Sequence, residues 1–244
     1  MNETESVRND SEPFRNPLEL EYQGTISELR KFKNDDRYIV RVEPLTKSDD
    51  HKVFREVMER FEAASGLHYA PYWDLIAKSR DETNHVSPGL KNQYGEYNAT
   101  YRVTKRVEGI SLSDYLKNPD GSIPPDQISK CMEGIVKYLI DSYNERVTFS
   151  PEIRPDQFVY GKVEGDTNNK MYMVDLDNLV FSQPSEEEVL EGFNDCLGYL
   201  VALGEHTPDS SATIRKIKDF IANNVSWEDE LTDDINEKIH ILTP

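Results

Sequence analysis

Two short segments of the chain contain the residue types that could carry chemistry. Residues 149–160 include Glu152 and Gln157, a carboxylate and an amide five residues apart, and Asp175 ends an apolar run that follows. Two acids and an amide can converge on a metal-bound phosphate, where one acid orients an attacking hydroxyl and the other groups hold magnesium. The segments therefore fit phosphoryl transfer, although their spacing alone also fits loop charges and a simple turn.

The part of the chain before these segments predicts a small sheet and one helix. Alternation of apolar and polar residues predicts strands over residues 18–24, 38–43 and 97–107. The polar residues 33–36 predict a turn between the first two strands. Apolar residues at helical spacing predict a helix over residues 49–65, which ends at Gly66. Residues 68–93 have no clear period, which indicates a strand or two with a long loop.

The rest of the chain predicts mostly helices around one hairpin. A short helix is expected over residues 112–116, and longer ones begin at Pro124, after Ser185 and around Ile214 and Leu231. Apolar residues predict the hairpin strands over 158–160 and 171–176, with a polar turn over 161–170 between them. Strong helices on both sides of this hairpin predict a core that includes Ile135, Leu139, Val174, Phe193 and Leu197.

The two chemical segments resemble a known family. Residues 150–157 read Ser-Pro-Glu-Ile-Arg-Pro-Asp-Gln, and residues 174–177 read Val-Asp-Leu-Asp. They resemble the catalytic loop and metal-binding hairpin of the protein-kinase-like fold, particularly the aminoglycoside and choline phosphotransferase branch. The pattern of that branch runs roughly His-Gly-Asp-Leu-His-Pro-x-Asn, then a hairpin ending Ile-Asp-Trp-Glu/Asp. The resemblance implies catalytic roles for Glu152 and Arg154, and magnesium-binding roles for Gln157 and Asp175.

The order of the other elements resembles the same family, which implies a nucleotide site. Arg41 on the predicted strand 38–43 would contact the phosphates of ATP, and Glu56 on the following helix would be its ion-pair partner. Gly24 would lie in the loop that covers the phosphates. The backbone around Val107 and Gly109 would hold the adenine ring at the hinge.

The fold implied by this resemblance is α+β and two-lobed, with ATP bound between the lobes. Residues 18–108 would form an N-terminal lobe, a small antiparallel sheet of five strands with the helix 49–65. Residues 109–244 would form a mostly helical C-terminal lobe that contains the loop 149–160 and the hairpin 158–177. The expected cofactors are ATP and Mg²⁺, and the expected partner is a small-molecule or protein substrate.

Departures from the family pattern leave two functions open. Glu152 stands where the family has Asp and Gln157 where it has Asn, so each side chain is one methylene longer than the family's. A productive site tolerates displacements of only about 0.5 Å. One expectation is a divergent kinase-like enzyme that transfers the γ-phosphate of ATP to a hydroxyl. The alternative is a catalytically inactive pseudokinase that acts as a protein-binding or regulatory module.

Composition excludes several other classes of function. The chain of 244 residues has a formal charge of −18, and no basic stripe suited to nucleic acid is visible. Residues 1–17 are polar, predicting a disordered leader, and no run of eighteen apolar residues predicts a membrane span. Cys131 and Cys196 lie in apolar helical patterns, which favours buried free thiols in a reducing compartment. We therefore expect an acidic cytoplasmic protein that binds neither nucleic acid nor membranes.

Overall fold

The computed structural model describes residues 18–23, 28–32, 35–44, 68–69, 72–77, 99–145, 153–174, 183–204, 210–225 and 230–243. Over these residues the chain has the predicted α+β class, with two small sheets and a mostly helical remainder. Its contacts divide it into two compact units. Unit 1 comprises Met1–His51 and Ala70–Arg106, and unit 2 comprises Lys52–Tyr69 and Val107–Pro244. The predicted helix over residues 49–65 lies outside the described residues.

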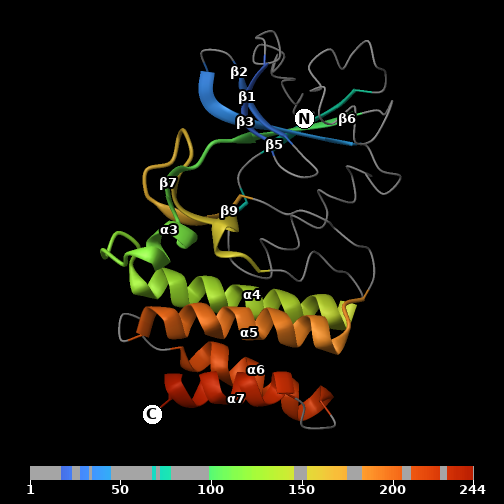
Figure 1. Ribbon diagram of the computed structural model, residues 1–244, viewed down its shortest axis with the longest axis vertical. Coiled ribbons are helices and arrows are strands. Elements are labelled where there is room, and N and C mark those ends of the chain that lie inside the picture. Colours follow the sequence, from blue (N-terminus) through green and yellow to red (C-terminus); the bar gives the residue numbers. More distant parts are fainter. Residues whose placement is uncertain are drawn as a thin grey trace, which may run out of the picture. The chain divides into compact units, whose positions relative to one another are not determined.

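Unit 1 contains a five-stranded antiparallel sheet in the order β1-β2-β3-β6-β5 (Figure 1). Its strands are β1 (Leu18–Gln23), β2 (Glu28–Phe32), β3 (Asp35–Pro44), β5 (Tyr72–Ala77) and β6 (Ala99–Lys105). Alternation predicted β1, β3 and β6 to within a few residues. The predicted turn over 33–36 is wrong in part, because Asp35 and Asp36 already belong to β3.

Strand β2 was not predicted because its sequence, Glu-Leu-Arg-Lys-Phe, has charged residues at three of five positions. In the structure Arg30 is buried and pairs with Val40 of β3. A long arginine stem can be buried among apolar groups while its head keeps polar contacts, so charge alone does not place a residue outside a sheet. On β3, Tyr38 and Val40 are buried whereas Ile39 and Arg41 are half-buried, as the alternation predicted.

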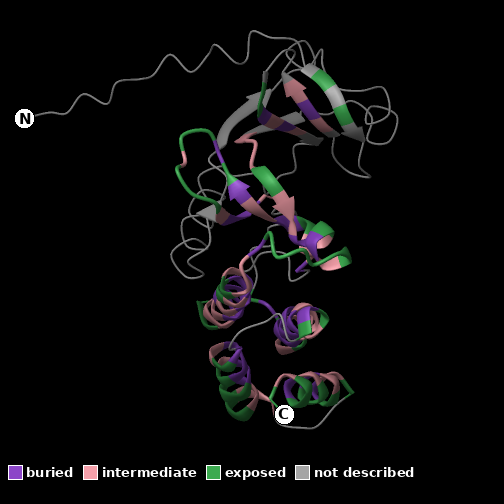
Figure 2. Cartoon of the chain, turned by 90° about the vertical axis from the view of Figure 1, so that its left-hand side faces the viewer, coloured by how far each residue is buried: buried purple, intermediate pink, exposed green. Residues whose placement is uncertain are grey.

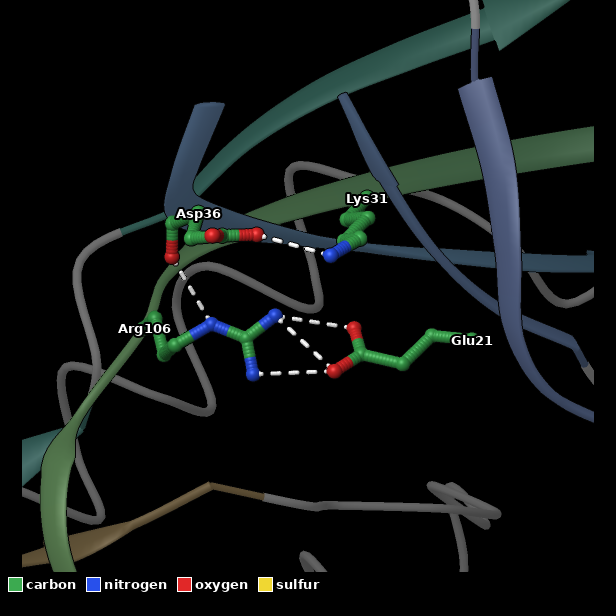
Figure 3. A network of polar contacts seen from close by, with 4 residues as sticks. All are labelled: Glu21, Lys31, Asp36 and Arg106. Atoms are coloured by element: carbon green, nitrogen blue, oxygen red, sulfur yellow. Dashed lines mark hydrogen bonds and ion pairs between the residues drawn. The ribbon is translucent and has the colours of Figure 1, made fainter. Parts of the chain in front are cut away.

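An ionic network fixes the point where the chain leaves unit 1 (Figure 3). The Arg106 guanidinium donates to both oxygens of Glu21 on β1, with the shortest N–O distance 2.8 Å. Its Nε donates to the carbonyl of Asp36 at 2.8 Å, and Lys31 Nζ lies 2.9 Å from Asp36 Oδ1. The backbone N–H of Arg106 also donates to the Arg37 carbonyl at 2.7 Å. A bidentate arginine–carboxylate pair fixes geometry as well as charge, so the last residue of unit 1 is tied to β1 and β3.

Unit 2 contains a four-stranded sheet in the order β4-β9-β8-β7. Its strands are β4 (His68–Tyr69), β7 (Glu108–Ser111), β8 (Phe158–Lys162) and β9 (Lys170–Met173). The pairing is antiparallel except between β4 and β9, which run parallel. The predicted hairpin is present, but β8 extends to Lys162 and β9 ends at Met173 rather than at residue 176.

The helices of unit 2 follow the predicted order (Figure 1). They are α3 (Leu112–Lys117), α4 (Pro125–Glu145), the 3₁₀ turn η2 (Pro155–Gln157), α5 (Glu186–Leu203), α6 (Ser211–Asn224) and α7 (Glu230–Leu242). The predicted capping box opens α5: Ser185 N donates to Glu188 Oε2 at 2.6 Å, and Glu188 N donates to Ser185 Oγ at 3.1 Å.

The core of unit 2 lies between these helices, with α4 packed on α5 and α6, and α5 packed on α7 (Figure 2). Ile135, Phe193 and Leu197 are fully buried and Leu139 is nearly so, as predicted. Val174 is only half-buried, because β9 ends one residue before it. No described helix is long and apolar enough to span a bilayer.

Both cysteines are buried in this core as free thiols, as the sequence predicted. Cys131 lies on α4 and Cys196 on α5. Burial raises the pKa of each thiol above its ordinary value, because the thiolate would lose its hydration. Both therefore act as small apolar side chains in the packing between helices.

The contact between α4 and α5 allows a test of the core. A Cβ at Gly192 would lie 2.6 Å from Leu139 Cδ1. Leu139→Ala should lower the free energy of unfolding by about 2–5 kcal/mol. Gly192→Ala should lower it by about 1–3 kcal/mol through overpacking. The double variant should lose less than the sum, because the new methyl occupies space that Leu139 vacates; urea denaturation measures all three values.

Gly198→Ala on the same helix is the matched control. A Cβ there would meet nothing closer than Lys238 Cε at 3.9 Å, so this variant should be neutral or gain up to about 1 kcal/mol from helix propensity. Additive effects of Leu139→Ala and Gly192→Ala, within about 0.5 kcal/mol, would contradict the contact.

Candidate functional site

The described residues include five of the nine residues predicted for the site. They are Arg41, Val107, Gly109, Arg154 and Gln157, whereas Gly24, Glu56, Glu152 and Asp175 lie outside the described residues. Arg41 lies on β3 in unit 1, and the other four lie in unit 2. Arg154 and Gln157 share one loop of unit 2.

The loop that contains Arg154 and Gln157 is fixed to the core of unit 2. It follows Ile153, whose side chain is only 1% exposed. Pro155 starts the single 3₁₀ turn η2, and the N–H of Gln157 donates to the Arg154 carbonyl at 3.1 Å. Proline suits this position because its fixed φ matches the turn and its missing N–H costs no hydrogen bond there. The turn also packs against α3 and β7.

The hairpin brings the end of this loop next to the residue that precedes Asp175. Phe158 at the start of β8 pairs with Met173 at the end of β9. One residue further out, the N–H of Val174 donates to the carbonyl of Gln157 at 2.8 Å. The pairing therefore brings together two segments that are seventeen residues apart in sequence, as the hairpin prediction required.

The side chain of Gln157 makes a hydrogen bond within its own loop. It is 3% exposed, and its Oε1 accepts the backbone N–H of Arg154 at 3.3 Å. This hydrogen bond occupies one of the two lone pairs of the amide oxygen, and the predicted role of Gln157 as a magnesium ligand stays a prediction. Among the described residues, no group of three His, Cys, Asp or Glu side chains is placed to hold a metal.

Arg154 is the charged group that the loop presents. Its side chain is 41% exposed, and its Nε lies 3.5 Å from Oδ1 of the exposed Asp156. Nε is itself shielded from solvent and has no hydrogen-bond partner within the described part of the chain. Because the ion pair with Asp156 is long and involves only Nε, it occupies little of the guanidinium's capacity for an anion.

The far end of the hairpin is closed by Asp166, which sequence analysis did not single out. Its Oδ2 accepts a short hydrogen bond from the Tyr172 hydroxyl and one from the Val163 N–H at 3.3 Å. Its Oδ1 accepts from Lys170 Nζ at 3.1 Å. The Tyr172 hydroxyl first, and Lys170 next among the favourable contacts, lower the pKa of Asp166 below its ordinary value. The signal was hidden because residues 161–170 look like an ordinary polar turn.

Gly109 has a structural reason to be glycine. It pairs with Gly161 across β7 and β8. A Cβ at Gly109 would lie 2.1 Å from the Tyr160 carbonyl oxygen, and one at Gly161 would lie 2.3 Å from the Glu108 carbonyl oxygen. The two backbones approach so closely that neither position has room for a side chain. The predicted adenine contact at Gly109 is not needed to explain this glycine, and Val107 is half-buried beside it.

No family model matches this chain, and no curated protein matches it. The resemblance to the protein-kinase-like fold therefore depends on the residues quoted above and on the order of the elements.

The Asp166 contacts predict a specific dependence of stability on pH. A carboxyl whose pKa is lowered by folding stabilises the protein above its unfolded pKa of about 4, and this contribution is lost as the pH falls through the folded pKa. Asp166→Asn should therefore be less stable than the native protein at pH 7, and the difference should shrink at lower pH. Thermal unfolding followed from pH 7 to pH 2 measures it.

Tyr172→Phe is the matched background for this test, because it removes the main hydrogen-bond donor to Asp166. The cost of Asp166→Asn at pH 7 should be smaller in that background. An equal loss of stability at pH 7 and pH 2 would show that the carboxylate's charge is not what closes the hairpin.

Proposed function

We propose that this chain is a divergent kinase-like protein of the cytoplasm that binds ATP with Mg²⁺ and transfers the γ-phosphate to a hydroxyl. The acceptor would be a small molecule or a protein. One observation carries the proposal: the hydrogen bond from Val174 N to the Gln157 carbonyl, which sets the residue before Asp175 against the loop that follows Glu152. The two-lobed kinase-like arrangement belongs to this proposal. The five-stranded sheet of unit 1 and the helical unit 2 support it.

The proposed roles follow the residue types. Glu152 would orient the attacking hydroxyl. Because the transition state of phosphoryl transfer is loose, the acid needs to do little more than position this hydroxyl. Arg154, half-exposed and weakly paired, would supply positive charge to the phosphates. Arg41, in unit 1, would contact the α- and β-phosphates with Glu56 as its ion-pair partner, and Gly24 would lie over the phosphates. Val107 and Gly109, in unit 2, would lie near the adenine.

The net negative charge of the chain explains why an ATP site in it would need cations. The chain has a formal charge of −18, so ATP would be repelled unless positive groups were concentrated around its phosphates. Mg²⁺ bound with ATP supplies charge neutralisation, and Asp175 would hold it. Gln157 would be the second protein ligand of the ion, through the lone pair that its hydrogen bond to the Arg154 N–H leaves open.

The engagement of Gln157 favours a second function, an inactive pseudokinase that acts as a protein-binding or regulatory module. The buried amide of Gln157 already accepts the Arg154 N–H, so the loop uses this side chain for its own structure without any metal. Phosphate release from Mg-ATP by the purified chain separates the two functions. Turnover that Glu152→Ala abolishes supports the enzyme, whereas nucleotide binding without turnover supports the pseudokinase.

Nucleotide binding is predicted to need both magnesium and Asp175. At 100 times the dissociation constant, Mg-ATP should stabilise the native protein by about 2.7 kcal/mol, which raises the melting temperature by several degrees. ATP with EDTA should give a much smaller shift. Asp175→Ala should lose the Mg-ATP shift, because a carboxylate is the preferred protein ligand of this hard cation. Differential scanning fluorimetry measures these shifts.

Asp219→Ala, which removes an exposed acid on α6, is the control and should keep the full shift. An undiminished shift in Asp175→Ala would remove that residue from the site. No shift with any nucleotide and metal would contradict nucleotide binding as a whole.

A further inference from the structure

One peptide unit in the loop is held at both ends by side chains. The carbonyl of Ile153 accepts a short hydrogen bond from the hydroxyl of Tyr199 on α5. The N–H of Arg154, on the other side of the same peptide bond, donates to Gln157 Oε1 at 3.3 Å. Tyr199 and Gln157, which provide these contacts, are 42 positions apart in sequence and hold the same peptide unit in the folded chain.

A peptide held in this way has little freedom to rotate. The peptide unit is planar and rigid, and its C=O and N–H point in opposite directions. With one hydrogen bond alone, the peptide plane could still rotate about the line between its two Cα atoms. Hydrogen bonds at both the C=O and the N–H remove that rotation, and the buried side chain of Ile153 anchors the peptide unit to the core. We call this arrangement the Tyr199–Gln157 clamp.

The clamp connects the loop to a rigid element. Tyr199 is half-buried on α5, between the fully buried residues Cys196 and Leu200. This helix packs against α4 and α7, and its first turn is fixed by the capping box of Ser185 and Glu188. A donor on such a helix keeps its position when the loop moves, so it can set the loop's orientation.

We propose that Tyr199 is a positioning residue, which together with Gln157 sets the orientation of the backbone that carries Glu152 on one side and Arg154 on the other. Gln157 thus has the role of a loop clamp in addition to its proposed role as a metal ligand. The catalytic consequence rests on the proposed function, whereas the clamp itself depends only on the contacts of Ile153 and Arg154.

Amide hydrogen exchange tests the clamp without any assay of activity. Tyr199→Phe keeps the ring and removes only the hydroxyl, so the exchange of the Arg154 N–H should become about tenfold faster or more, as expected for one lost hydrogen bond. The amide of Ile217 on α6 should be unaffected and reports that the fold is intact. Unchanged exchange at Arg154 in this variant would overturn the clamp.

Tyr143→Phe is the matched control. This tyrosine is half-buried on α4, with its ring edge-on to Phe220 at 5.2 Å between ring centroids. The variant should leave the exchange of Arg154 unchanged. Equal acceleration in both variants would mean that loss of any tyrosine hydroxyl loosens the loop, and would overturn the specific role of Tyr199.

Gln157→Asn separates the clamp from a metal-binding role. It introduces the family's amide but shortens the side chain by one methylene, so the amide oxygen no longer reaches the Arg154 N–H. The clamp predicts faster exchange at Arg154 in this variant. Unchanged exchange combined with tighter Mg-ATP binding would assign Gln157 to the metal and overturn its place in the clamp.

Steady-state kinetics test the positioning role. Tyr199→Phe should lower kcat about tenfold and leave the KM for ATP nearly unchanged, because the misplaced loop affects the reacting groups more than nucleotide binding. Faster exchange with unchanged kcat would overturn the positioning role. If the native protein has no turnover, faster exchange at Arg154 still supports the clamp, and the proposed catalysis is what fails.

Discussion

The pairing of β8 with β9 is the constraint on which the candidate site depends. Strand β8 lies between β9 and β7, so it is held on both sides. The loop before it and the segment after β9 are brought together at the open end of the hairpin, where Val174 N donates to the Gln157 carbonyl. A shift of one residue in this register would turn every side chain of the hairpin to the opposite face.

Several local features keep that register in place. Gly109 and Gly161 allow β7 to approach β8 so closely that no Cβ would fit between them. Asp166 closes the turn by accepting hydrogen bonds from a tyrosine, a lysine and a backbone N–H. At the other end, Tyr199 connects the loop to α5. The hairpin is thus fixed at its turn, along its edge and at its base, which is what a site built on a loop requires.

The sequence predicted elements with strong local signals and missed those that depend on tertiary contact. The capping box at Ser185 and the apolar spacing of α4 and α5 were sufficient to place these helices and most of their buried residues. Strand β2 was missed because three of its five residues are charged, and one of these, Arg30, is buried in the sheet. Within the loop, the spacing of Glu152 and Gln157 indicated a shared site, but it could not show that Gln157 accepts a hydrogen bond from the backbone of Arg154. Tyr199 could not be found, because nothing in a helix sequence marks a hydroxyl that reaches a carbonyl 46 residues away.

Native-state hydrogen exchange of the Val174 amide tests this account most directly. If the hairpin and its loop are an integral part of unit 2, this N–H should exchange only through large unfolding events. Its opening free energy should then fall with added denaturant in parallel with that of the Leu139 amide in α4. Fast exchange that does not respond to denaturant would mean that the segment opens locally. The loop would then not be held against the hairpin, contrary to this account.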